Sequence, residues 1–402
     1  SLLSVVDRTV TAGGGRLLER RLSAPSRVLD EVQRRQEAVA YAVDHTTTAN
    51  QWRESLRRVP DLDRALSRLS LDRGGPRDLT AVRNTITQSL DLAETLSQLD
   101  LPPLLSHLTV DMAQQEELLD LLDNALIAEP PLLARDGGFI ATGFHAELDE
   151  ARTLRDEGRG VVAGLQAQYA EETGITSLKV KHNNVLGYFI ECTATHGEKM
   201  LAMGERFIHR QTTANALRFT TVELSDLETR ILNAGGRALE IEKRLFENLR
   251  QAILEQAAPL GSMARALAEL DLTTALADLA RSEDWCRPVI DDSRTFRIDA
   301  GRHPVVEAAL KASGDPFVAN DCELSPRDGA AIWLLTGPNM AGKSTFLRQN
   351  ALIALLAQMG GFVPAQSAHI GLVSQIFSRV GASDDLARGR STFMVEMVET
   401  AA

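Results

Sequence analysis

Aromatic residues are scarce in this chain of 402 residues, where Phe, Trp and Tyr together make up 4%. Trp52 is followed by no further aromatic residue until Phe139. A chain that is poor in Tyr and Phe but rich in Leu, Ala, Glu and Arg is typical of a mostly helical protein. No apolar run approaches the roughly 18 residues that a membrane span requires, which argues against a transmembrane protein.

Cysteine is also rare. Cys192, Cys286 and Cys322 are odd in number and far apart, which argues against both a disulfide framework and a Cys-x-x-Cys metal site. This usage indicates a reducing compartment, and we expect a cytoplasmic protein. The chain opens at Ser1 with neither an initiator Met nor a basic segment, so we expect a chain that begins inside a larger protein.

Length and charge set broader limits. A chain of 402 residues predicts two to four domains, and a hydrophobic content of 44% is ordinary for globular proteins. There are 43 Lys and Arg against 55 Asp and Glu, a net charge of −12. Taken alone, this charge argues against a nucleic-acid partner.

Helical spacing dominates the first 130 residues. Leucines recur at steps of three and four in two stretches, which are Leu62, Leu66, Leu69 and Leu92, Leu96, Leu99. Gly74-Gly75-Pro76 and Leu101-Pro102-Pro103 separate the predicted helices. Helix packing explains these leucines, and nothing in the stretch indicates catalysis.

A small β-rich module interrupts the helical pattern. Residues 178–181 alternate, Asn183-Asn184 favours a tight turn, and residues 187–193 predict a second strand. A charged helical stretch over residues 147–172 precedes the module. Apolar positions at steps of three and four follow it, from Leu224 to Leu245, and predict a long helix. The pattern indicates two long helices carrying a β-rich tip.

An α/β domain is predicted to begin near residue 289. Strands are expected at residues 288–290, 296–298 and 330–335, and a helix from Phe346 to Gln358. Between the last strand and this helix, residues 337–344 match G-x-x-x-x-G-K-[ST]. In such a loop backbone N–H groups surround phosphates, the lysine (Lys343) reaches the β- and γ-phosphates, and the hydroxyl of Ser344 ligates Mg²⁺. We therefore expect ATP or ADP with Mg²⁺ as the ligand.

ATP hydrolysis by a P-loop enzyme also needs an acidic residue at the end of a second apolar strand. The acidic residues that follow the loop are Asp384, Asp385, Glu396 and Glu399, and none follows four consecutive apolar residues. We expect a nucleotide-binding half-site with no complete set of catalytic residues.

Several segments resemble the MutS family of DNA mismatch-repair ATPases, in that family's order. They are residues 3–11, residues 301–307, the loop at 336–345 with its internal Pro-Asn-Met, residues 362–365 and residues 384–397. The resemblance implies a multidomain α plus α/β fold. It has a helical core and lever over residues 1–155 and 223–288 and an inserted β-rich clamp over 156–222. The start of a truncated P-loop (ABC-type) ATPase domain follows over 289–402.

The resemblance also implies roles for individual residues. Phe317 would stack on adenine, Asn339 matches the loop asparagine, and Ser391 would reach a partner's ATP across a dimer. The nucleotide-binding set would comprise Phe317, Gly337, Pro338, Asn339, Met340, Ala341, Gly342, Lys343, Ser344, Thr345 and Ser391. By itself Phe317 would be interpreted as a core residue, and Ser391 as a helix cap.

The family implies mismatched double-stranded DNA, a second copy of the chain and a MutL-type repair factor as partners, in the bacterial cytoplasm at the nucleoid. The mismatch-reading and connector domains, the Asp-Glu catalytic strand and the C-terminal dimerisation helices have no match in this sequence. A non-catalytic DNA-binding or assembly scaffold of the same superfamily is therefore the alternative interpretation.

The β-rich module carries a local positive charge. Between Lys179 and Arg218 there are six basic and three acidic residues, an excess of three positive charges. This charge alone is equally consistent with a solvated surface, but the resemblance to the MutS clamp favours contact with the DNA backbone. The candidate DNA-binding residues are Lys179, Lys181, Asn183, Asn184, Arg210, Gln211, Thr212, Asn215 and Arg218.

Overall fold

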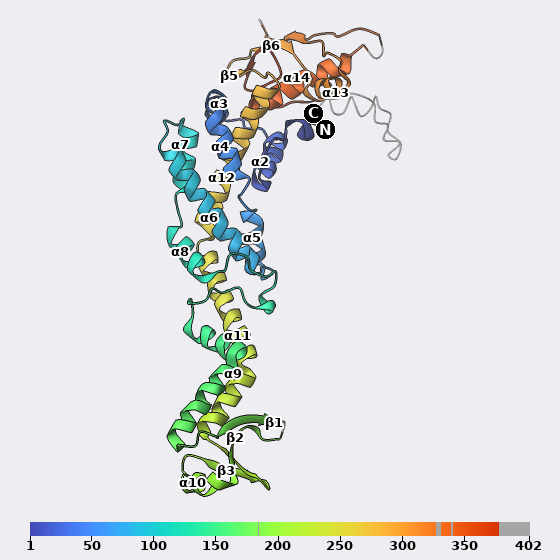
Figure 1. Cartoon of the computed structure of the whole chain (residues 1–402). Helices are drawn as coiled ribbons and strands as arrows, with labels where there is room; N and C mark the ends of the chain where they lie inside the picture. The colour runs from blue at the N-terminus through green and yellow to red at the C-terminus, as the bar shows by residue number, and fades with distance from the viewer. Residues whose placement is uncertain (184, 327–330, 339–340, 378–402) are drawn as a thin grey trace. The chain divides into compact units, whose positions relative to one another are not determined.

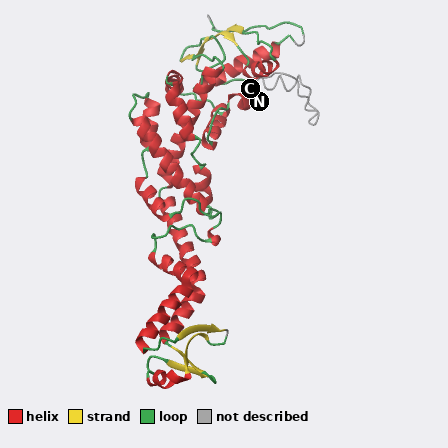
Figure 2. Ribbon diagram, viewed as in Figure 1, coloured by secondary structure: helices red, strands yellow, loops and turns green. Residues whose placement is uncertain are grey.

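The computed structural model describes residues 1–183, 185–326, 331–338 and 341–377. The chain is mostly helical and contains two small sheets (Figure 2). It divides into two compact units. The first comprises Ser1–Ser67, Asn84–Glu116 and the described part of Gln256–Ala402, and the second comprises Arg68–Arg83 and Glu117–Glu255. The domain boundaries drawn from the sequence stay predictions.

Helices make up most of the first unit (Figure 1). Its helices are α1 (Leu2–Val6), α2 (Ala12–Ser23), α3 (Leu29–Asp44), α4 (Thr46–Leu56), α7 (Pro103–Met112), α12 (Ala257–Ser282), α13 (Pro304–Ser313) and α14 (Lys343–Gln358). Helices α5 (Leu62–Ser70) and α6 (Pro76–Ser97) are divided between the two units. The predicted breaks at 74–76 and 101–103 lie between α5, α6 and α7, so the helical prediction for this region is confirmed.

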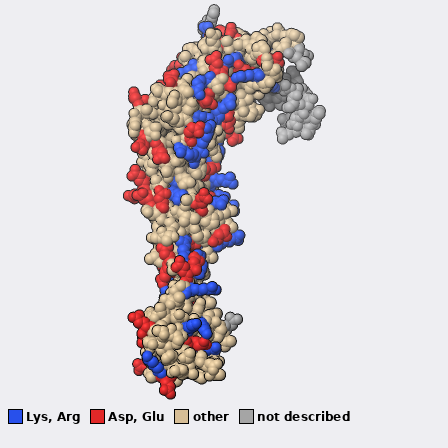
Figure 3. All heavy atoms as spheres, viewed as in Figure 1, with Lys and Arg blue, Asp and Glu red and all other residues tan. Residues whose placement is uncertain are grey.

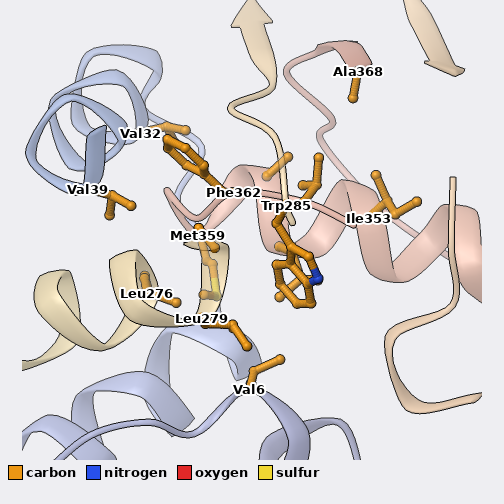
Figure 4. Close-up of a cluster of buried hydrophobic side chains, with 14 of the residues drawn as sticks. Val6, Val32, Val39, Leu276, Leu279, Trp285, Ile353, Met359, Phe362 and Ala368 are labelled. Carbon is orange, nitrogen blue, oxygen red and sulfur yellow. The ribbon is translucent and has the colours of Figure 1, made fainter. Parts of the chain in front are cut away.

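Helix α12 is the central element of the first unit. It packs against α2, α3, α4 and α7, and most of its residues are buried. A helix that is buried on nearly every side needs apolar or small residues all round, and α12 is rich in Leu and Ala. Figure 4 shows one apolar cluster that includes Leu276 and Leu279 of α12, Val32 of α3 and Ile353 of α14.

The sheet of the first unit has the strand order β5-β8-β6-β7. Its strands are β5 (Val289–Asp291), β6 (Phe296–Gly301), β7 (Asn320–Glu323) and β8 (Ser367–Gly371). The β5–β8 pair is parallel, and the other two pairs are antiparallel. The strands predicted at 288–290 and 296–298 are confirmed as β5 and β6, and the helix predicted from Phe346 is α14.

The strand predicted over residues 330–335 is wrong for its described part. Residues 331–335 have no regular secondary structure, and the apolar side chains of Ile332 and Leu334 are 87% and 90% exposed; Ala330 lies outside the described residues. An apolar strand is stable only when neighbouring strands accept its hydrogen bonds. The described strands of this sheet pair among themselves and leave this segment without such a neighbour.

The second unit carries the β-rich module on two long antiparallel helices, α9 (Ala146–Thr173) and α11 (Val222–Glu255). Arg237 of α11 pairs with Glu147 of α9, while Ile231 of α11 lies near Gly158 of α9. The remaining helices of this unit are α8 (Glu116–Ala125), the 3-10 turns η1 (Ala134–Asp136) and η2 (Ala194–His196), and α10 (Gly197–Ala202). The predicted pair of long helices flanking a β-rich module is confirmed.

The sheet of the second unit is antiparallel, with the order β1-β2-β4-β3. Its strands are β1 (Lys179–Asn183), β2 (Gly187–Thr193), β3 (Ile208–Thr212) and β4 (Ala216–Thr220). One face packs on an apolar cluster that includes Ile190, Cys192 and Phe219 of the sheet and Leu165 and Leu224 of the helices. This packing leaves the other face for charged residues.

No helix in the described parts of the chain is both long and apolar enough to cross a membrane.

Candidate functional site

One face of the second unit's sheet carries four of the candidate DNA-binding residues together with the acidic residue Glu191. Lys179 pairs with Glu191, Glu191 with Arg218, and Arg218 with Gln211 across successive strands. Residues directly opposite each other in a sheet share a face, and so does Lys181, two residues after Lys179. The strand register thus brings together four of the candidate residues, which the sequence separates by up to 39 positions.

Glu191 neutralises part of this face. Its carboxylate accepts a hydrogen bond of 2.6 Å from the Nζ of Lys181 and one of 3.2 Å from the Nε of Arg218. The hydrogen bond from Lys181, followed by that from Arg218, holds the pKa of Glu191 below its usual range. The guanidinium of Arg218 also lies 4.7 Å from the ring centre of Phe189. Lys181, Arg218 and Glu191 together present one net positive charge.

Arg210 is placed differently from the paired cations. His209 pairs with Phe219 and Gln211 with Arg218, so Arg210 is the extra residue of a β-bulge in β3. A bulge turns the side chain of the extra residue away from the regular alternation of the strand. Arg210 and Lys179 are both exposed, and within the described residues neither forms an ion pair. These two side chains are the cations best placed for an external phosphate.

The polar candidates have local structural roles. Asn183 Oδ1 accepts hydrogen bonds from the backbone N–H groups of Val185 and Leu186, at 2.9 and 2.8 Å, and so holds the turn between β1 and β2. The hydroxyl of Thr212 lies 3.0 Å from Nε2 of His209. Asn215 is exposed in the β3–β4 turn. Asn184 lies outside the described residues.

The same turn contains a glycine that the local packing requires. Gly187 has a φ of +69°, and a Cβ at this position would lie 2.0 Å from Oε1 of Glu228 on α11. The carboxylate of Glu228 accepts a hydrogen bond from the Tyr188 N–H at 3.3 Å. The turn that ends at β2 is thereby fastened to α11 within the second unit.

Carboxylates from outside the counted window lower the positive charge of the module. Arg206, one of the six basic residues, donates hydrogen bonds to Glu172 and Glu223, which lie outside the counted window. Including these two carboxylates leaves six basic and five acidic residues, an excess of one. Arg206 also lies over the ring of Tyr169, 5.8 Å from its centre, so it supports the module's structure.

The glycine-rich loop lies in the first unit, directly before α14. Gly342 has a φ of +87°, a left-handed conformation that favours glycine, and it caps the helix that begins at Lys343. The backbone N–H groups of Lys343, Ser344 and Thr345 occupy the first turn of α14, where a helix leaves its donors unpaired and carries a partial positive charge. This turn suits a phosphate group.

Lys343 contacts the loop itself. Its Nζ donates hydrogen bonds to the carbonyl oxygens of Gly337, at 2.5 Å, and Pro338, at 2.7 Å. The ring of Trp333 is parallel to that of Phe346, with the ring centres 6.4 Å apart.

Among the other candidate nucleotide-binding residues, Ala341 and Ser344 are exposed, and Thr345 is half-buried. Phe317 is half-buried in the loop between α13 and β7, while Asn339, Met340 and Ser391 lie outside the described residues.

The described residues of the two sites do not supply the ligands of a transition-metal centre. Within the described residues, no group of three His, Cys, Asp or Glu side chains is arranged to hold a metal ion. The donors at the glycine loop are a lysine, a hydroxyl and backbone N–H groups. This set fits a phosphate ester, with a Mg²⁺ ion held jointly by the Ser344 hydroxyl and phosphate oxygens.

The charge pairing by Glu191 is the feature that the sequence reasoning missed. Alternation places residues 179 and 181 on one face of β1 and residues 189 and 191 on one face of β2, and the register that pairs Lys179 with Glu191 makes these the same face. The pairing of Arg218 of β4 with Glu191 also depends on the strand register, because the two residues are 27 positions apart in the sequence.

Two family models match the sequence: MutS domain III over residues 1–277 and MutS domain V over residues 333–402. The chain belongs to the MutS family. DNA mismatch repair proteins MutS are 69% identical to it in Roseobacter denitrificans and Ruegeria pomeroyi and 67% identical in Paracoccus denitrificans. Each comparison covers 100% of this chain and 46% of the relative. The chain thus spans about half the length of the MutS relatives that it matches.

Proposed function

We propose that this chain acts in DNA mismatch repair, with the sheet of the second unit contacting the DNA backbone and the glycine loop of the first unit binding ATP or ADP. The identity to MutS proteins along the whole chain carries this proposal. The exposed cations Lys179 and Arg210 and the open first turn of α14 support its two parts. In this proposal a second copy of the chain, mismatched DNA and a MutL-type repair factor are the partners, in the bacterial cytoplasm at the nucleoid.

The DNA contact is independent of sequence. Lys179 and Arg210 supply charge to phosphates, and Lys181 and Arg218 share one further positive charge after pairing with Glu191. Gln211 and Asn215 present amide groups beside them. Phosphate contacts of this kind position a protein on the duplex without reading its bases. A module that grips mismatched DNA of any sequence requires this property.

The nucleotide contact uses the first turn of α14. The N–H groups of this turn would donate to phosphate oxygens, and Lys343 would exchange its two carbonyl acceptors for the β- and γ-phosphates. Ser344 would hold Mg²⁺, which neutralises phosphate charge when bound. Phe317 and Asn339 complete the proposed site within the chain, and Ser391 would reach the nucleotide of a second copy.

The experiment that tests the proposal measures both ligands on the full 402-residue chain. Fluorescence anisotropy with a duplex oligonucleotide, at several salt concentrations, reports DNA binding, and a fluorescent ATP analogue with Mg²⁺ reports nucleotide binding. We expect duplex affinity to fall as salt rises, because bound cations release counterions from DNA. Absence of both binding activities under low-salt conditions would overturn the proposal.

A non-catalytic DNA-binding or assembly scaffold is the second candidate. One observation favours it: residues 331–335, which precede the loop, are exposed and lack the strand structure that the P-loop prediction requires. Binding of a fluorescent ATP analogue with Mg²⁺ separates the two candidates. DNA binding without nucleotide binding fits the scaffold, whereas robust phosphate release from ATP excludes it.

A further inference from the structure

A cavity in the first unit has five arginines among its twelve lining residues. Its volume is about 610 Å³, which is in the range of small-molecule sites. The arginines come from three helices: Arg16, Arg20 and Arg21 from α2, Arg35 from α3, and Arg265 from α12. Asp63 and Glu269 are the acidic residues in its lining. In Figure 3, Lys and Arg side chains lie intermixed with Asp and Glu on the face near α2. We call this feature the arginine cavity.

Three of the five guanidinium groups are paired. Arg16 makes two hydrogen bonds to Asp61, at 2.9 and 2.8 Å, and one to Asp63 at 2.9 Å. Arg21 pairs with Glu269, and Arg35 pairs with Glu31. These pairs fix the wall of the cavity and leave little of their charge for an external ligand.

The other two guanidinium groups are not balanced. Arg20 and Arg265 are exposed, and no carboxylate of the described residues lies within ion-pair distance of either. Arg265 donates a hydrogen bond of 2.9 Å to the hydroxyl of Ser262, one turn earlier on its own helix. Arg20 and Arg265 therefore bring two positive charges to the rim of the arginine cavity from different helices.

The buried wall also has an unused donor. Arg21 is only 8% exposed, and its Nε–H has no acceptor within the described residues. Oε1 of Glu269, its partner, likewise has no donor, so this pair is only half satisfied. Burial, followed by repulsion from Arg21, lowers the pKa of Arg35. The buried Nε–H of Arg21 is thus a donor that an oxygen atom of an anion would satisfy.

We propose that the arginine cavity binds a phosphate group, supplied either by a free polyphosphate or nucleotide or by the backbone of a polynucleotide. The planar guanidinium fork matches the oxygens of phosphate, and several forks from different helices suit a tetrahedral anion better than a planar carboxylate. The cavity is a separate site from the glycine loop and from the sheet of the second unit. It shares no lining residue with either.

The test compares a double variant with a matched control on the full chain. Arg20→Gln with Arg265→Gln removes both unpaired guanidinium groups and breaks no ion pair. Arg58→Gln is the control, because Arg58 is exposed and, within the described residues, its side chain donates only to the hydroxyl of Ser55, three residues earlier, as that of Arg265 does to Ser262. Pyrophosphate binding is measured by calorimetry in a Lys343→Ala background. Duplex binding is measured by anisotropy in an Arg210→Gln background.

We expect the double variant to bind at least one probe about tenfold more weakly than the control does, as for the loss of charge-assisted hydrogen bonds. Weaker pyrophosphate binding alone identifies a free phosphate as the ligand, and weaker duplex binding identifies a polynucleotide. Equal behaviour of the double variant and the Arg58→Gln control with both probes would overturn the proposal.

A second measurement does not depend on the folding of the variants. Phenylglyoxal modifies accessible guanidinium groups, and mass spectrometry locates the modified residues in the unsubstituted chain. Whichever probe is the ligand should protect Arg20 and Arg265 but not Arg58. Equal modification of all three arginines with and without each probe would contradict the site.

Discussion

Glu191 and Arg218 face each other on neighbouring antiparallel strands, with 3.2 Å between Oε2 of Glu191 and Nε of Arg218. The same carboxylate holds the Nζ of Lys181 at 2.6 Å. One acidic side chain therefore controls how much positive charge the sheet of the second unit presents. The predictions about DNA binding follow from this arrangement.

Replacing Glu191 with Gln should strengthen DNA binding. The change keeps the shape of the side chain but releases Lys181 and Arg218 for phosphate, so the magnitude of the salt slope, d log K/d log[salt], should rise by about 0.9. Fluorescence anisotropy with a duplex oligonucleotide at several salt concentrations measures both quantities. Glu205→Gln is the control, because Glu205 is exposed in the same module and pairs with no described cation. Equal gains in both variants would show that only net charge matters.

Lowering the pH from 8 to 5 should not protonate Glu191, and so should not strengthen DNA binding as the Glu191→Gln substitution does. Its folded-state pKa lies below the usual value because Lys181, and next Arg218, hydrogen-bond to the carboxylate. A depressed carboxyl pKa means that the pairing stabilises the fold above the unfolded-state pKa and is lost as the pH falls through the folded-state pKa. The salt slope of the Glu191→Gln variant and that of the parent should therefore differ by the same amount at pH 5 and at pH 8.

Replacing Arg210 with Gln should weaken DNA binding more than replacing Lys181 does. Arg210 is exposed at the bulge of β3 without a described ion-pair partner, whereas the ammonium of Lys181 already donates to Glu191. We expect the salt slope to fall by about 0.9 for Arg210→Gln. The same anisotropy titration applies, with Lys199→Gln on α10 as the control. A larger effect at Lys181 than at Arg210 would reject the assignment of Arg210 as a direct phosphate contact.

Local sequence patterns were enough to predict the long helices and the strands β1 and β2. The apolar spacing of Leu224 to Leu245 and the alternation at residues 187–193 both come from burial of one face, which the sequence displays directly. The strands β3 and β4 were not predicted, since every residue of β3 is exposed and shows no alternation of burial. Strand β4 depends on hydrogen bonds to β2, and β3 depends on hydrogen bonds to β4, which no local pattern reports.

Before the nucleotide loop, the sequence predicts a strand that the structure does not form. Residues 332–335 are apolar enough to predict a buried strand, but a buried strand also needs neighbours, and the segment is exposed. The helix after the loop was predicted correctly, because its cap at Gly342 and its apolar face are local features. The charge of the β-rich module also depends on residues distant in sequence, because Arg206 is neutralised by Glu172 and Glu223, which lie on flanking helices.

Replacing Lys343 with Ala should lower nucleotide affinity by about tenfold or more, as for the loss of a charge-assisted hydrogen bond. The fold should persist, because the described hydrogen bonds of the Lys343 side chain are those to the carbonyls of Gly337 and Pro338. Binding of a fluorescent ATP analogue measures the change. Lys311→Ala is the control, since Lys311 lies on α13 and pairs with Glu283. An unchanged affinity would contradict the phosphate role of Lys343.

Replacing Ser344 with Ala should remove the effect of Mg²⁺ and leave metal-free binding intact. The hydroxyl is the proposed magnesium ligand, and its backbone N–H remains at the first turn of α14. The measurement is the ratio of ATP-analogue affinities with Mg²⁺ and with a chelator. That ratio should approach one in the variant. Equal ratios in the variant and the parent would show that Mg²⁺ is held without Ser344.

Replacing Glu242 with Ala should open the connection between η1 and α9 in the second unit. Glu242 is buried on α11, where it accepts hydrogen bonds of 2.9 and 2.7 Å from the Gly138 N–H and pairs with Arg152 of α9. Its loss leaves a largely buried guanidinium and an amide without their acceptor, a cost of about 3 kcal/mol.

A chain with two compact units need not unfold in one transition, so hydrogen exchange resolved by segment is the suitable measurement. The amide of Gly138 should exchange about 100-fold faster, as that free energy implies. Glu240→Ala, at an exposed position on the same helix, should leave exchange at Gly138 unchanged, and equal rates in the two variants would rule out this role for Glu242.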